Sequence, residues 1–227
     1  MDVVLIILMI ILSIFLMFIS QYLFEKKGII YIYLIYNIVS FLLSFKITEI
    51  LGININSNVI LSSLITSLTY LIIEKNNLNE FKNIIRNVFI INIITSIILL
   101  ISSLYIGTVN DLSSVNMENL FLNNYQILIS YPIVTLLNQL LTLLIYKNIS
   151  DITENTNIRI MLSNLTILMI ETLLFSIFSY IFKIKFTTIL IIVVSNYLIK
   201  VLISLIYTPL ISYLIKLKKV KIWIMHY

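Results

Sequence analysis

The 227-residue sequence contains no cysteine and no alanine, and it has only three glycines, two prolines and one histidine. Without cysteine, the chain cannot form disulfides, thiolate metal sites or a thiol nucleophile. The single histidine, His226, excludes HExxH zinc chemistry, which needs two histidines, and leaves no histidine near a candidate nucleophile. No aspartate lies within an apolar run, which excludes an intramembrane aspartyl protease. We therefore expect no enzyme activity, no metal and no cofactor.

Charged residues are also scarce. They make up 11% of the chain, whereas about a quarter of the residues in soluble domains are charged. Hydrophobic residues make up 60%, and the mean hydropathy is +1.09. This composition predicts an integral membrane protein. The net charge of +5 is then explained by the sorting of basic residues among loops, so we expect a lipid bilayer and not nucleic acid as the partner.

Long apolar segments recur along the chain, and a membrane-spanning helix needs roughly 20 apolar residues. We predict an all-α fold, a polytopic transmembrane helical bundle with six core spans plus one N-terminal span, seven in total. The third segment is short, so we expect it to be buried among the others or broken. The predicted spans are residues 3–24, 29–46, 57–73, 84–107, 125–146, 159–182 and 186–215.

Basic residues are distributed unevenly over the connecting segments, and cytoplasmic loops are normally the lysine-rich and arginine-rich ones. With seven spans, the uneven distribution predicts an N-out/C-in arrangement. Three basic residues then lie outside (Lys46, Lys183 and Lys185), one lies within the membrane (Lys200), and eleven lie inside: Lys26, Lys27, Lys75, Lys82, Arg86, Lys147, Arg159, Lys216, Lys218, Lys219 and Lys221.

Two ionisable side chains lie deep inside predicted spans. Glu171 is the exception among ten acidic residues, since the other nine lie at span ends or in loops, and Lys200 is its basic counterpart. Glu171 lies roughly 18 Å along the sixth span, at 1.5 Å per residue, and Lys200 falls near the same depth in the seventh. Spans joined by a short turn are antiparallel neighbours. We therefore expect Glu171 and Lys200 to form an ion pair.

Such a pair has two interpretations. Ionisable groups inside the membrane usually mark a substrate or ion pathway. The alternative is a purely structural pair that fixes helix register, or a lysine that extends to the interface, although the latter is disfavoured from mid-span.

A second polar group is the adjacent pair Asn138 and Gln139, which lies in the apolar segment YPIVTLLNQLLTLLIY. Two carboxamides offer donors and acceptors suited to the edge of a planar base, although they could equally serve as hydrogen-bonding links between helices. Asn196 and Ser163 lie in the seventh and sixth spans and could join a common polar cavity.

The order of these polar positions is similar to that of a known family. The segment ending FKITEILG has the form K-x-x-E-x-x-G, and YLIKVLISLIYTPLISYLIK carries lysine, Thr-Pro and tyrosine at the family's spacing. From about Lys26 to Lys216, the chain resembles the bacterial queuosine precursor transporters, the VUT family of vitamin-uptake-like proteins. The matching positions are Lys46, Glu49, Gly52, Asn58, Thr69, Glu74, Glu80, Gln139, Arg159, Ser163, Glu171, Phe175, Lys200, Thr208, Pro209 and Tyr213.

The resemblance implies a multi-pass transporter in the inner (plasma) membrane. It implies import of a queuosine precursor, a 7-deazaguanine base such as 7-cyano- or 7-aminomethyl-7-deazaguanine. It also implies six core spans around a central polar cavity, as in the membrane substrate-binding subunits of vitamin uptake systems. Residues 1–25 would be an extra N-terminal transmembrane helix and residues 26–227 the transporter domain. A homodimer and a separate energising module are both open as further partners.

Under this resemblance, Glu171 accepts hydrogen bonds from the N–H and amine edge of the base, and Lys200 balances the acid or binds the carbonyl. Tyr70, Thr142 and Tyr207 stand where the family carries acidic residues. A non-transporting membrane sensor or anchor module remains an alternative, as does a substrate-binding membrane subunit for another small molecule. The candidate substrate-binding residues are Glu171, Lys200, Gln139, Asn138, Ser163, Asn196, Glu74 and Arg159.

Overall fold

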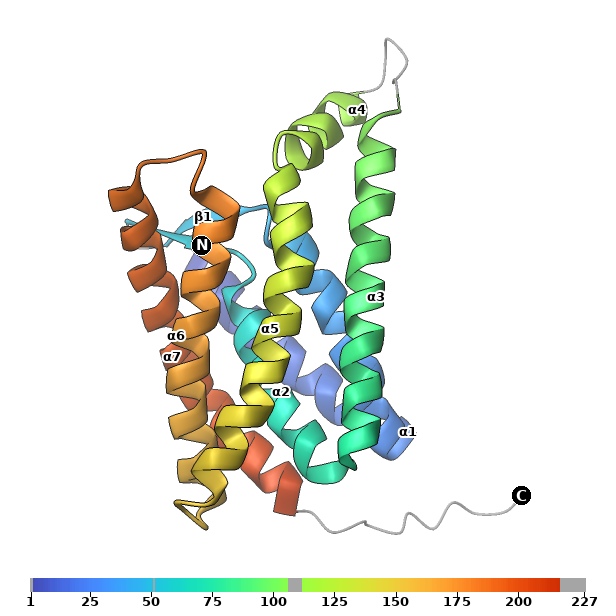
Figure 1. The fold of residues 1–227 in the computed structure, drawn as a ribbon, viewed down its shortest axis with the longest axis vertical. Helices are drawn as coiled ribbons and strands as arrows, with labels where there is room; N and C mark the ends of the chain where they lie inside the picture. The colour runs from blue at the N-terminus through green and yellow to red at the C-terminus, as the bar shows by residue number, and fades with distance from the viewer. Residues whose placement is uncertain (1, 51, 106–111, 217–227) are drawn as a thin grey trace, which may run out of the picture.

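The computed structural model describes residues 2–50, 52–105 and 112–216, which form a bundle of long helices with one short β-hairpin (Figure 1). The tail residues Lys218, Lys219, Lys221 and His226 lie outside the described residues, as does the predicted end of the fourth span at residue 107. The elements are α1 (Asp2–Leu43), β1 (Ile47–Ile50), β2 (Ile53–Asn56), α2 (Val59–Lys75), α3 (Leu78–Ser103), α4 (Leu112–Met117), the π-helix η1 (Glu118–Leu122), α5 (Tyr125–Ser150), α6 (Thr156–Tyr180) and α7 (Phe186–Lys216).

The all-α prediction is confirmed, because each predicted apolar segment falls largely within a helix. Among the described residues, five helices are long and apolar enough to cross a membrane: α1, α3, α5, α6 and α7. Helix α1 contains the first predicted span and most of the second, and α2, at 17 residues, is shorter than these five helices. The length and composition of these helices indicate a membrane protein. The total of seven spans stays a prediction.

Helix α1 reverses direction at Glu25, whose φ of 50° is uncommon for a residue other than glycine. The hydroxyl of Ser20 donates to the carbonyl of Gly28 (2.8 Å), and the hydroxyl of Tyr36 donates to the carbonyl of Ser13 (2.6 Å). From the first bond to the second, the residue before Glu25 changes from Ser20 to Ser13, while its partner after Glu25 changes from Gly28 to Tyr36. Residues 2–24 and 26–43 are therefore two antiparallel helices.

Helix α2 is the centre of the bundle. Every residue from Val59 to Ile72 is buried, and α2 contacts α1, α3, α5, α6 and α7. The prediction that this short segment is buried is confirmed. Its hydroxyl side chains bond to the preceding turn of the same helix, as in Ser63 to the carbonyl of Val59 (2.8 Å) and Ser67 to that of Ser63 (3.0 Å). Serine and threonine are therefore tolerated at the centre of an apolar bundle.

The β-hairpin between α1 and α2 was not predicted. Strands β1 and β2 pair antiparallel, and Gly52 in the connecting turn has a φ of +79°, the left-handed region that such two-residue turns require. Asn56 attaches the hairpin to the bundle. Its backbone N–H donates to Oδ1 of Asn196 (2.9 Å), and its side-chain amide donates to the hydroxyl of Tyr180 (3.0 Å).

The loops separate into two ends of the bundle. At one end, Lys26 pairs with Glu80 (2.8 Å) and Arg159 with Glu74 (3.1 Å), which joins the turn of α1 to the start of α3 and the start of α6 to the end of α2. At the hairpin end, Lys183 donates to Oδ1 of Asn124 (2.8 Å). The predicted inside residues that the structure describes lie toward the first end, and Lys46, Lys183 and Lys185 lie at the hairpin end. The N-out/C-in orientation itself stays a prediction.

The close contact at Gly28 leaves no space for a side chain at this position. A Cβ atom at this position would lie 1.9 Å from the carbonyl oxygen of Ser20. We expect Gly28→Ala to force the two halves of α1 apart and to destabilise the protein by about 1–3 kcal/mol, measured by unfolding in detergent. Ser20→Ala is the matched control, because it removes one hydrogen bond without a clash and should lower stability by about 1 kcal/mol or less. Equal stability of Gly28→Ala and wild type would contradict the antiparallel packing.

Candidate functional site

Glu171 and Lys200 form a buried ion pair between the middle of α6 and the middle of α7. The distance from Nζ of Lys200 to Oε1 of Glu171 is 2.8 Å, and the two side chains are only 5% and 11% exposed. The predicted ion pair is therefore present. Neither charge is favourable away from water on its own, and each becomes tolerable through the other.

Glu171 also borders a small polar cavity. The cavity volume is about 20 Å³, enough for about one water molecule and far below the roughly 300–1,000 Å³ of small-molecule pockets. The walls come from the second half of α1, the start of α2, the middle of α5 and the middle of α6. The lining residues are Asn37, Asn58, Ser62, Ile65, Tyr131, Val134, Thr135, Asn138, Glu171 and Phe175.

Within the part of the chain that the structure describes, two residues that line this cavity carry a buried acceptor without a donor. Oε2 of Glu171 and Oδ1 of Asn37 are buried and have no hydrogen-bond partner among the described residues. The amide of Asn37 donates to the carbonyl of Tyr33 (2.8 Å), which leaves its oxygen as the free group. A buried acceptor without a donor is unfavourable, so this wall favours a ligand that presents N–H or O–H groups.

Aromatic rings form the apolar part of the wall. Tyr131 and Phe175 line the cavity, and their rings meet edge to face with centroids 6.2 Å apart. Tyr131 also stacks on Phe41 (4.5 Å, 10° between planes) and donates its hydroxyl to the carbonyl of Asn37 (3.1 Å). A ring of this kind offers a flat face to a planar ligand.

The structure brings some of the predicted binding residues to the cavity and leaves others elsewhere. Glu171 and Asn138 line it, and Lys200 contacts Glu171 without lining it. Gln139 and Ser163 are buried and do not line the cavity, and their side-chain polar atoms have no hydrogen-bond partner among the described residues. Asn196 does not line the cavity either. Its Oδ1 accepts the hydrogen bond from the backbone N–H of Asn56 in the hairpin.

Glu74 and Arg159 belong to a separate cluster where α2, α5 and α6 meet, away from the hairpin end. Arg159 Nη1 lies 3.1 Å from Oε1 of Glu74, and the Tyr146 hydroxyl donates to the same oxygen (2.7 Å). The guanidinium also lies over the Tyr146 ring, 5.2 Å from its centroid, and the rings of Tyr146 and Tyr70 are 4.8 Å apart. These contacts tie the three helices together at that end of the bundle.

Sequence reasoning missed several residues that line the cavity, among them Asn37, Ser62 and Thr135. Asn37 carried a usable signal, because it is a lone carboxamide inside the apolar segment YLIYNIVSF. Ser62 and Thr135 carried none, since hydroxyl side chains occur throughout the apolar segments and many bond to a carbonyl of their own helix.

A family model described as "Vitamin uptake-like sensor" matches residues 39–214, more than three quarters of the chain. The chain therefore belongs to the vitamin uptake-like sensor family, and the expected vitamin-uptake-like membrane family is confirmed. The match includes the cavity residues from Asn58 to Phe175 and begins just after Asn37. No curated protein and no solved structure matches the chain. Specificity for a queuosine precursor stays a prediction.

The buried ion pair predicts strong energetic coupling. Glu171→Gln or Lys200→Gln alone leaves one buried charge without its partner and should lower the free energy of unfolding by about 3 kcal/mol or more. The double variant Glu171→Gln/Lys200→Gln should be less destabilised than either single variant, as measured by a double-mutant cycle in detergent.

The exposed pair Lys26 and Glu80 is the matched control for this cycle. Its side chains are about half exposed, so Lys26→Gln and Glu80→Gln should couple by about 1 kcal/mol or less. Additive effects at Glu171 and Lys200, similar to those of the control pair, would show that the pair does not bear on stability.

Proposed function

We propose that this member of the vitamin uptake-like sensor family imports a queuosine precursor, a 7-deazaguanine base such as 7-cyano- or 7-aminomethyl-7-deazaguanine. Family membership supports an uptake-related membrane protein. The choice of base is the proposal's own step. It rests on the resemblance of the polar positions and on the chemistry of the cavity wall. We propose transport and not catalysis, since the sequence has no cysteine and a single histidine.

The observation that carries the proposal is the geometry of Glu171. Lys200 engages Oε1 of Glu171, and Glu171 lines the cavity together with Asn37. Oε2 of Glu171 and Oδ1 of Asn37 are free acceptors among the described residues. The edge of a 7-deazaguanine that carries the ring N–H and the exocyclic amine presents adjacent donors. A carboxylate is the natural acceptor for such an edge, and charge-assisted hydrogen bonds are the strong ones.

The remaining roles in the proposal follow from position. Asn138 lines the cavity, whereas Gln139 does not, so Asn138 supplies the carboxamide for the opposite edge of the base. Tyr131 and Phe175 receive the face of the ring. Lys200 balances the charge of Glu171 and stays behind it. In this arrangement, residues of α1, α5 and α6 hold the base, and Ser62 and Ile65 of α2 form the remaining part of the cavity wall.

Binding a base requires the cavity to widen, because about 20 Å³ accommodates about one water molecule. The proposal therefore includes a movement of α5 and α6 away from α1 and α2, and a transporter must in any case move helices to change the side from which its site is open. Asn58 and Ser62 lie at the start of α2 beside the hairpin, so the cavity is in the hairpin half of the bundle.

We place the hairpin end outside the cell and the lysine-rich end in the cytoplasm, with the protein in the inner (plasma) membrane. The distribution of basic residues supports this orientation. It puts the cavity nearer to the outside, where an importer first meets its substrate. The energy source, a homodimer and a separate energising module remain outside the proposal.

The test is uptake of labelled 7-deazaguanine base by cells that cannot make it, with queuosine in tRNA as a second readout. Glu171→Gln and Lys200→Met should each reduce uptake to background while the protein still inserts, because the acceptor or its counter-charge is lost. Glu118→Gln, at an exposed glutamate of η1, is the matched control and should transport normally.

Two outcomes would contradict the proposal in different ways. Normal uptake by both site variants would remove Glu171 and Lys200 from the transport mechanism. Binding of the base by purified wild-type protein without uptake by cells would favour the sensor or substrate-binding alternative over an importer.

A further inference from the structure

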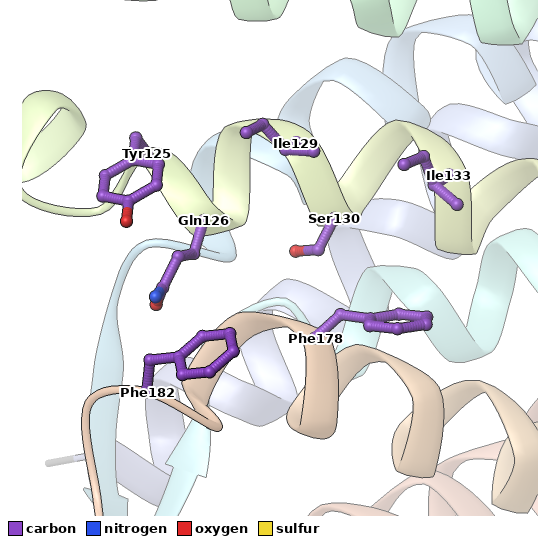
Figure 2. Close-up of a pocket in the computed structure, with 7 residues that line it drawn as sticks. All are labelled: Tyr125, Gln126, Ile129, Ser130, Ile133, Phe178 and Phe182. Atoms are coloured by element: carbon purple, nitrogen blue, oxygen red, sulfur yellow. The ribbon is translucent and has the colours of Figure 1, made fainter.

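A second hollow lies on the outside of the bundle between α5 and α6, away from the polar cavity. Its volume is about 230 Å³, and it is lined by Tyr125, Gln126, Ile129, Ser130 and Ile133 of α5 and by Phe178 and Phe182 at the end of α6 and just beyond it (Figure 2). We call it the α5–α6 groove. Both helices are candidate membrane spans, and several lining residues are exposed, such as Ile129 (60%) and Phe182 (85%). The groove therefore faces the bilayer.

The groove is apolar along most of its length and polar at one end. Figure 2 shows Gln126 pointing from α5 toward Phe182, and Ser130 directed into the space between the two helices. The hydroxyl of Ser130 is engaged with that of Ser179 (2.7 Å). Oε1 of Gln126 is buried and has no hydrogen-bond partner among the described residues. The polar end thus offers a free acceptor.

A cation lies at this same end. Lys183 directly follows Phe182, and its Nζ donates to the carbonyl of Asn123 and to Oδ1 of Asn124 (2.8 Å), which directly precedes Tyr125. Partial burial lowers the pKa of Lys183 below its usual value. A nearby anion favours the charged form of a lysine.

We propose that the α5–α6 groove binds a phospholipid whose head group carries a hydrogen-bond donor. One acyl chain lies along Ile129, Ile133 and Phe178, and the phosphate lies next to Lys183. The head-group donor, an ammonium or a hydroxyl, reaches Oε1 of Gln126. The combination of an apolar groove that faces lipid with a cation and a free acceptor at one end matches a phospholipid better than a soluble anion, which would leave the apolar walls without a partner.

The test uses the purified full-length chain, stripped of lipid in detergent and titrated with single phospholipids while bound lipid is counted by native mass spectrometry. Phosphatidylglycerol and phosphatidylethanolamine carry head-group donors and should bind about tenfold more tightly than phosphatidylcholine, which has none. Gln126→Leu should abolish this preference, and Lys183→Met should weaken all three lipids.

Lys185→Met is the matched control for charge, because it removes a lysine from the same turn. Ile129→Trp fills the groove and should displace lipid, whereas Ile97→Trp, at an exposed position of α3, should not. A melting curve for each variant identifies any that does not fold, and the comparison of the three lipids on wild-type protein needs no variant.

Equal binding of phosphatidylcholine by wild-type protein would overturn the proposal, as would unchanged lipid binding by Ile129→Trp. Competition by inorganic phosphate as effective as that by phospholipid would also overturn it, since that result would identify a phosphate site without a role for the acyl chain.

Discussion

The pairing of Glu171 with Lys200 is the interaction on which the arrangement of this protein depends. A carboxylate and an ammonium near the middle of two membrane helices are tolerated only in contact, and the 2.8 Å bond holds α6 against α7 at one register. The same bond occupies one oxygen of Glu171, a residue that lines the cavity, and leaves the other without a partner among the described residues. The same contact therefore holds the two helices together and leaves the other oxygen of Glu171 as the acceptor of the candidate site.

The sequence predicts this part of the protein well, because the physical signals are strong and local. Long apolar runs can only be helices in a bilayer, since every backbone polar group must be satisfied within the segment. Glu171 and Lys200 stand out because they are the charged residues deepest within those runs, and the short turn between α6 and α7 makes the two helices neighbours. The burial of α2 followed from its length in the same way.

The composition of the cavity could not be predicted with the same success, because it depends on the direction in which each side chain points. Asn138 and Gln139 are adjacent in sequence, yet one lines the cavity and the other does not, since neighbouring residues on a helix lie about 100° apart. Asn196 looked equivalent to them but binds the hairpin, which had not been predicted. The two strands are only four residues long, and β1 (ITEI) does not alternate between apolar and polar residues, so the hairpin gave no clear periodic signal.

The two candidate sites share the same pair of helices. Thr135 and Asn138 of α5 and Glu171 and Phe175 of α6 border the cavity, while the α5–α6 groove lies between the same helices nearer to the hairpin end. The bond between Ser130 and Ser179 joins α5 to α6 at the level of the groove. A movement of α5 relative to α6 that widens the cavity must change the groove as well. A lipid that prefers one spacing of these helices then changes the affinity of the cavity for its ligand. Because coupling between two binding sites is reciprocal, the ligand changes the affinity of the groove for that lipid by the same factor.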